Sequence, residues 1–162
     1  MDGADVSVTP GRPNLKADGF AAMASDARVE INCLLDIVNA RQQGRTLARK
    51  LGFDGCEPTL IATAISEVAR NIVEHARSGE IILVPIRKRG RRGIKIVARD
   101  SGPGIPDLSR AMQYGFSTRG HTGVGLRGAK WLMDEFDVRS QRGKGTTITM
   151  KKWAGQLGGQ HR

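Results

Sequence analysis

The stretch Asp100-Ser-Gly102-Pro-Gly104 joins a carboxylate to two closely spaced glycines. It follows the alternating run Ile94–Ala98, which is typical of a strand with one apolar face. Glycine is used where φ must be positive or where a ligand must touch the backbone. A carboxylate at a strand end, beside bare backbone, suits a planar heterocycle with an exocyclic amine. A simple Asp-Gly turn at the end of a strand is the alternative interpretation.

A second glycine-rich stretch, Gly123-Val-Gly125-Leu-Arg-Gly128, matches the pattern Gly-x-Gly-x-x-Gly. A dinucleotide-binding unit would need an apolar strand in front of it, whereas residues 116–122 are mostly polar, so we reject that interpretation. Glycines at the start of a helix can still present backbone N–H groups to phosphates. The alternative is a helix entry that needs only flexibility.

Glu67 and Asn71 lie four residues apart on a helix predicted over Pro58–Ala76. They share a stripe beside the apolar one. An amide oxygen of Asn71 suits Mg²⁺, which prefers oxygen ligands and is usually shared with substrate phosphates. A carboxylate one turn away can take a proton from a hydroxyl that attacks a phosphate. The alternative is a polar pair on an exposed helix face.

The elements that must position these groups alternate between helix and strand periodicity. We expect one domain over residues 28–153, a flexible N-terminal extension over 1–27 and a flexible tail over 154–162. The predicted helices cover 34–51, 58–76, 106–112 and 125–136, and the predicted strands cover 28–32, 80–87, 94–99, 136–140 and 146–153. Gly44 weakens the first of these helices.

The composition excludes several classes of protein. The 26 basic and 16 acidic residues give a net charge of +10, which favours an acidic partner. Residues 87–92 are predicted to form a basic hairpin tip, which is either a solvated turn or a docking patch. Nucleic acid is disfavoured as a partner because no aromatic residues are interleaved with the basic ones.

Neither a membrane span nor a secretory signal is visible in the sequence, so we expect a cytoplasmic protein. Cys33 and Cys56 are predicted to be buried thiols.

Four stretches together resemble the boxes of the GHKL ATPase superfamily. Glu67-Val-Ala-Arg-Asn71 resembles its N box, Asp100 to Gly104 its G1 box, Gly123-Val-Gly125-Leu its G2 box, and Gly145-Thr146 its closing Gly-Thr element. Within the superfamily the sequence is most similar to the RsbT-type switch kinases. The resemblance implies a two-layer α/β sandwich, the Bergerat ATP-binding fold, with helices on one face of a mixed sheet.

The resemblance also implies ATP and Mg²⁺ as cofactors. Asp100 would accept a hydrogen bond from the adenine amine, with support from Thr146. Gly102 and Gly104 would leave room for the adenine ring. Asn71 would be the metal ligand and Glu67 the catalytic base. Gly123 and Gly125 would contact the phosphates, and Val124 and Leu126 would also belong to the cofactor-binding segment. Residues 107–122 would form a lid, with Arg119 near the γ-phosphate.

The implied activity is phosphorylation of a serine or threonine on a STAS-domain antagonist protein. The implied docking partner is a regulatory phosphatase. The alternatives are an anti-sigma kinase that binds a sigma factor, a non-catalytic ATP-binding switch, and a nucleic-acid binder built on the basic hairpin. No dimerisation helix with a phosphoacceptor histidine precedes the predicted domain, which disfavours a histidine kinase.

Overall fold

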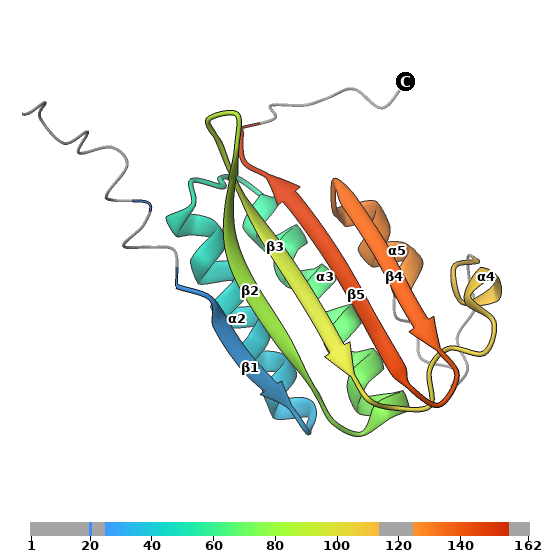
Figure 1. Cartoon of the computed structure of the whole chain (residues 1–162). Helices are drawn as coiled ribbons and strands as arrows, with labels where there is room; N and C mark the ends of the chain where they lie inside the picture. The colour runs from blue at the N-terminus through green and yellow to red at the C-terminus, as the bar shows by residue number, and fades with distance from the viewer. Residues whose placement is uncertain (1–19, 21–24, 114–124, 156–162) are drawn as a thin grey trace, which may run out of the picture.

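The computed structural model describes Phe20, residues 25–113 and residues 125–155. Figure 1 shows helices on one face of a twisted sheet, so the predicted two-layer α/β sandwich is confirmed. The elements are β1 (Ala27–Ile31), α2 (Leu34–Lys50), α3 (Glu57–Asn71), η1 (Ile72–Ala76), β2 (Gly79–Lys88), β3 (Arg91–Asp100), α4 (Leu108–Ala111), α5 (Gly125–Leu132), β4 (Glu135–Gln141) and β5 (Gly145–Trp153).

The strand order in the sheet is β1-β2-β3-β5-β4, and each of these pairings is antiparallel. The prediction of a mixed sheet is therefore wrong for the described strands. A single helix between two neighbouring strands would make them parallel. Two helices lie between β1 and β2, so the chain changes direction one more time and β2 runs antiparallel to β1. β4 runs in the same direction as β3, but β5 lies between them.

The core lies between the helices and the inner face of the sheet. The predicted apolar stripe of α3 is confirmed, since Ile61, Ile65 and Val68 are fully buried. The alternation predicted for β3 is also confirmed, with Ile94 and Ile96 on the buried face. A side chain at Gly44 of α2 would collide with Ile65 of α3, so the glycine permits the two helices to approach closely.

Two predictions about helices and one about the cysteines need correction. The helix predicted over 58–76 becomes a π-helix at Ile72–Ala76, and the helix predicted over 125–136 ends at Leu132 because Phe136 already pairs with Met150 in the sheet. Cys33 and Cys56 are exposed and not disulfide-bonded. Each cysteine is the residue just before a helix, outside the buried stripe that its neighbours form.

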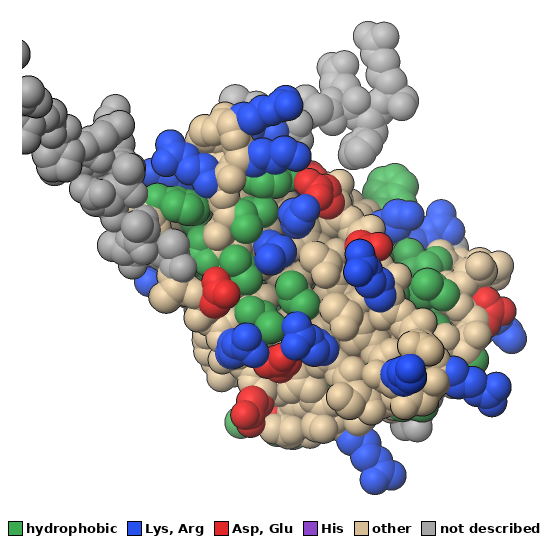
Figure 2. Space-filling model, viewed as in Figure 1, with side chains coloured by type: hydrophobic (Ala, Val, Ile, Leu, Met, Phe, Trp, Pro, Cys, Tyr) green, Lys and Arg blue, Asp and Glu red, His purple; other side chains and the backbone are tan. Residues whose placement is uncertain are grey.

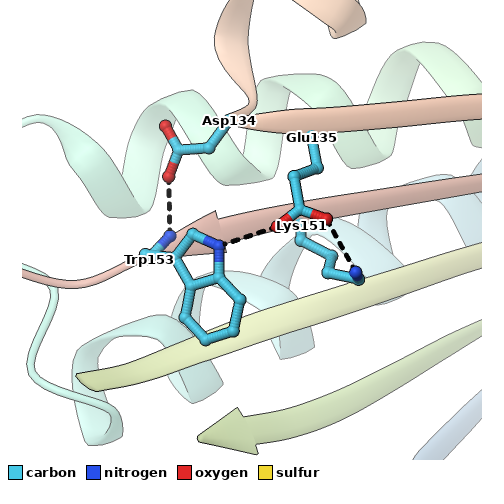
Figure 3. Close-up of polar contacts among 4 residues, drawn as sticks. All are labelled: Asp134, Glu135, Lys151 and Trp153. Atoms are coloured by element: carbon cyan, nitrogen blue, oxygen red, sulfur yellow. Dashed lines mark hydrogen bonds and ion pairs between the residues drawn. The ribbon is translucent and has the colours of Figure 1, made fainter. Parts of the chain in front are cut away.

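A polar cluster joins the start of β4 to the end of β5 (Figure 3). The Glu135 carboxylate accepts hydrogen bonds from Lys151 Nζ at 2.7 Å and from Trp153 Nε1 at 3.1 Å. The backbone N–H of Trp153 donates to Asp134 Oδ2 at 2.8 Å. These contacts hold the sheet together at the end that contains the β2–β3 turn.

Most of the predicted extension and tail lies outside the described residues, so their predicted flexibility stays a prediction. Of the extension, Phe20 packs against the core and Ala27 begins β1. None of the described helices has both the length and the apolar character needed to cross a membrane.

Candidate nucleotide site

Asp100 ends β3 with a carboxylate that the backbone holds by one oxygen. Asp100 Oδ1 accepts the N–H of Gly102 at 2.9 Å and the N–H of Thr146 at 3.2 Å. No described residue donates to Oδ2, and Asp100 lines a cavity of about 520 Å³. One oxygen therefore fixes the side chain, while the other is available to an N–H group of a ligand.

The two glycines after Asp100 allow the loop to approach different parts of the chain closely. Gly104 has φ +77° and lines the cavity, and a Cβ there would lie 2.5 Å from the carbonyl oxygen of Gln141. Gly102 is not among the residues that line the cavity. A Cβ at Gly102 would lie 2.6 Å from the Cβ of Ala76, so this glycine permits the loop to pass close to η1.

Glu67 and Asn71 project from the end of α3 into the same cavity. Glu67 is 8% exposed, and the Asn71 amide nitrogen is buried without a hydrogen-bond partner among the described residues. The amide oxygen and nitrogen exchange places when the group turns over. An unpartnered amide in a cavity fits a group that brings its own polar atoms, such as a phosphate-bound magnesium ion.

The chain leaves α3 through the π-helix η1, which sequence periodicity does not predict. π-helices are rare and are frequent at functional sites. Four residues of η1 line the cavity, namely Ile72, Glu74, His75 and Ala76. Sequence reasoning missed Glu74 and His75, because α-helical spacing from Asn71 does not describe a π-helical segment.

The start of α5 borders the cavity beside α3. The N–H of Gly125 donates to Glu67 Oε2 at 3.1 Å, and Leu126 lines the cavity at 6% exposure. Gly123 and Val124 lie outside the described residues. Of the predicted lid, residues 107–113 are described and Arg119 is not. Asp107 caps the short helix α4 by accepting the N–H of Arg110.

Thr146 at the start of β5 is 8% exposed and faces the cavity beside Asp100. Its hydroxyl lies 2.9 Å from Ser140 Oγ on β4. Ser140 also accepts the N–H of Ile105 at 2.7 Å. The sequence does not indicate Ser140, because a serine at an alternate position of an exposed strand has no distinctive signal.

The cavity has an apolar floor with polar groups at its ends. Ala98 and Ile148 pair across β3 and β5 beneath it, and both are 3% exposed. Carboxylates at Asp100 and Glu67 flank this floor, and Arg70 and Arg110 are also among the lining residues. Such a site suits a planar ring at the Asp100 end and phosphates toward α3 and α5.

The basic tip of the β2–β3 hairpin lies at the far end of the sheet from Asp100 (Figures 1 and 2). Its cations are all exposed, and none has an ion-pair partner among the described residues. They are Arg87, Lys88, Arg89, Arg91 and Arg92. The tip contributes nothing to the cavity lining.

Comparison with known proteins gives a consistent result. Residues 34–152 match the family described as Histidine kinase-like ATPase domain. The chain is 49% identical over 131 residues to the serine/threonine-protein kinase RsbT of Bacillus subtilis, covering 81% of this chain and 98% of that one. It is 36% identical over 102 residues to an anti-sigma F factor of Caldanaerobacter subterraneus, covering 59% of this chain and 70% of the other.

The solved structures that resemble this one share its fold at low identity. The RsbU and RsbW domains of Rv1364c from Mycobacterium tuberculosis align with a TM-score of 0.54 at 20% identity, covering 79% of this chain and 32% of that longer chain. The mycobacterial sensor histidine kinase MprB aligns with a TM-score of 0.50 at 15% identity, covering 83% of this chain and 99% of the other.

Proposed function

The chain belongs to the histidine kinase-like ATPase domain family, and on that premise we propose that it is an ATP-dependent protein serine/threonine kinase of a partner-switching pathway. The predicted resemblance to GHKL ATPases and RsbT-type kinases is confirmed. One observation supports the proposal above the others, namely a single cavity shared by predicted site residues from four elements and the loop after β3. They are Glu67, Asn71, Asp100, Gly104, Gly125, Leu126 and Thr146.

The adenine ring would lie on the apolar floor of the cavity. Asp100 Oδ2 would accept its exocyclic amine, and Thr146 would supply a second polar contact beside it. Gly104 would leave room for the ring, because the residue has no side chain and its backbone borders the cavity. Gly102 would act indirectly, by allowing the loop to approach η1 and by donating its N–H to Asp100.

The triphosphate would extend toward α3 and the start of α5. Asn71 would hold Mg²⁺, which neutralises phosphate charge, and ATP would supply the γ-phosphoryl group. The phosphates would be bound by Gly123, Val124, Gly125 and Leu126. In the structure Gly125 N–H donates to Glu67, so this hydrogen bond would be shared or exchanged when phosphates enter.

Glu67 would act as the general base. Its Oε2 is held by Gly125, so Oε1 is the oxygen that can take the proton of the acceptor hydroxyl. As that proton leaves, the hydroxyl oxygen forms a bond to the γ-phosphorus and the bond to the bridging oxygen breaks. The products are a phosphoserine or phosphothreonine and ADP.

The proposed substrate is a STAS-domain antagonist protein in the cytoplasm, and the proposed docking partner is a regulatory phosphatase. The resemblance to RsbT-type kinases supports this pair over a histidine acceptor. A sigma factor is the second candidate partner, favoured by the 36% identity to an anti-sigma F factor. Isolation of the complexes formed by the full chain would distinguish a STAS protein from a sigma factor.

The test compares Glu67→Gln with wild type, using radiolabelled ATP and a purified STAS-domain protein from the same genome. We expect transfer to fall by about 100-fold or more, while the Kd for ATP changes by less than about threefold. Glu30→Gln on the exposed outer face of β1 is the matched control and should transfer normally. Wild-type rates in the Glu67 variant would eliminate it as the base, and ATP binding without any transfer would favour a non-catalytic switch.

A further inference from the structure

Ser140 lies outside the cavity but connects two segments that bound it. It lines a second hollow of about 450 Å³ along β4 and β5, and Thr146 lines both spaces. The Ser140 hydroxyl accepts the N–H of Ile105 from the loop after Gly104. The same hydroxyl contacts Thr146 at the start of β5. Ser140 can therefore affect a ligand only through these neighbours.

The hydroxyl of Ser140 has one hydrogen to donate and two acceptors within reach. Thr146 Oγ1 is at 2.9 Å and the carbonyl oxygen of Gly145 is at 3.3 Å. Either hydroxyl of the Ser140–Thr146 pair can be the donor. Because the Ser140 oxygen already accepts the N–H of Ile105 at 2.7 Å, we assign the donor role to the Ser140 hydroxyl. When Ser140 donates to Thr146, the hydrogen of the Thr146 hydroxyl is free to point into the cavity.

This arrangement gives the cavity a defined pattern of hydrogen-bonding groups. Asp100 Oδ2 can accept a hydrogen bond from a ligand, and the Thr146 hydroxyl can donate one. The backbone N–H of Thr146 donates to Asp100 Oδ1, which holds the two residues together. Adenine offers an amine donor beside a ring-nitrogen acceptor, which complements this pattern. Hypoxanthine and guanine offer a carbonyl acceptor beside an N–H donor, which opposes it.

We propose that Ser140 is a positioning residue that sets the nucleobase preference of the site by directing the hydroxyl hydrogen of Thr146. The inference rests on the proposed function, because it requires that the cavity bind a purine nucleotide. Without the Ser140 hydroxyl, Thr146 is free to donate or to accept, and the preference for adenine weakens.

The experiment measures Kd for ATP and for inosine triphosphate in the wild type, Ser140→Ala and Ser140→Thr. In Ser140→Ala we expect the ratio of the two affinities to fall by about three- to tenfold, the worth of one hydrogen bond. Ser140→Thr keeps the hydroxyl and should hold the ratio within about twofold of wild type. Loss of the hydrogen bond from Ile105 lowers the affinity for both nucleotides equally, so it does not change the ratio of the two affinities.

An unchanged ratio in Ser140→Ala, with both affinities reduced equally, would overturn the inference and leave the proposed function intact. A wild-type protein that is folded but binds neither nucleotide would overturn both. Circular dichroism and the thermal midpoint verify folding. If the alanine variant does not fold, Ser140→Cys provides the same test, because a thiol is a weak donor of similar size.

Discussion

The two ends of the sheet are built in opposite ways. At the end with Asp100, backbone and side-chain contacts fix a loop against the β4–β5 turn, including Gly143 N–H to the Pro103 oxygen at 2.8 Å. At the other end the β2–β3 turn presents exposed cations, and nothing lies within 4 Å of a Cβ placed on Gly90. The first end is defined by shape and the second by charge.

This difference separates two kinds of recognition in one small domain. A site with a fixed donor and acceptor pattern can select a small ligand, because a displaced group loses its partner. An exposed cluster of like charges attracts acidic surfaces with little geometric demand and responds to salt. Substitutions at the two ends should therefore change different measurements.

The largest expected effect is on folding, from Gly145→Ala. Gly145 has φ +93°, and a Cβ there would collide with the backbone oxygen of Asp100. We expect the free energy of unfolding to fall by about 3 kcal/mol or more, from backbone strain and overpacking together. Gly90→Ala, with φ +80° and open space, is the matched control and should cost about 1 kcal/mol. Equal losses in urea denaturation would contradict the comparison.

The next effect is on nucleotide affinity, from Asp100→Asn. The amide can keep an oxygen toward the N–H groups of Gly102 and Thr146, but it then presents an NH₂ group to the adenine amine. We expect a loss of about 1.5–3 kcal/mol, which is more than tenfold in Kd. Calorimetric titration with ATP and Mg²⁺ measures it. Asp137→Asn, exposed on β4, should bind as wild type does, and unchanged binding in the Asp100 variant would remove Asp100 from the site.

A smaller effect concerns pH and the polar cluster at the charged end. Hydrogen bonds from Lys151 and then Trp153 lower the pKa of Glu135 below its ordinary value of 4.5. Its stabilising contribution is therefore present above about pH 4.5 and is lost as the pH falls through the lower folded-state pKa. The Glu135 side chain is 44% exposed, so we expect less than about 1 kcal/mol.

Urea unfolding between about pH 6 and 3 tests this, because Glu135→Gln should show a shallower acid dependence than wild type. The variant should bind ATP normally, since Glu135 lies at the end of the sheet opposite the cavity. A parallel acid dependence in both proteins would mean that the cluster does not couple to folding.

The smallest effect is expected from removing charge at the hairpin tip. Arg89→Ser, Arg91→Ser and Arg92→Ser together should leave the Kd for ATP within about twofold of wild type, because the proposed nucleotide site lies at the other end of the sheet. The charge-matched control replaces Arg41, Arg49 and Lys50, which are exposed on α2. Loss of a protein partner only in the hairpin variant would favour the docking patch over a solvated turn.

Much of the fold followed from periodicity in the sequence. The spacing of Ile61, Ile65 and Val68 predicts a buried helix face, and alternation in Ile94 and Ile96 predicts a strand face, because both patterns are repeated over several turns or pairs. The prediction of a mixed sheet was wrong, since relative strand direction depends on which strands become neighbours. No local pattern shows that β5 inserts between β3 and β4.

In the candidate site, too, local sequence patterns indicate some residues and miss others. Asp100 and Thr146 were found because motif spacing indicates them, and the structure brings them within hydrogen-bonding distance. Ser140, Glu74 and His75 were missed. Ser140 acts across two strands, and the π-helix at Ile72–Ala76 shifts the helical phase after Asn71, so α-helical spacing alone does not describe that segment.

The position of β5 in the sheet has a consequence for synthesis of the protein. β5 follows all other described strands in the chain, yet it lies between β3 and β4. While a ribosome is still making residues 145–153, β3 has an unpaired edge and Asp100 has no Thr146 beside it. An open strand edge is a template for wrong pairing. Until that final strand emerges, the edge of β3 therefore stays open to pairing with another strand.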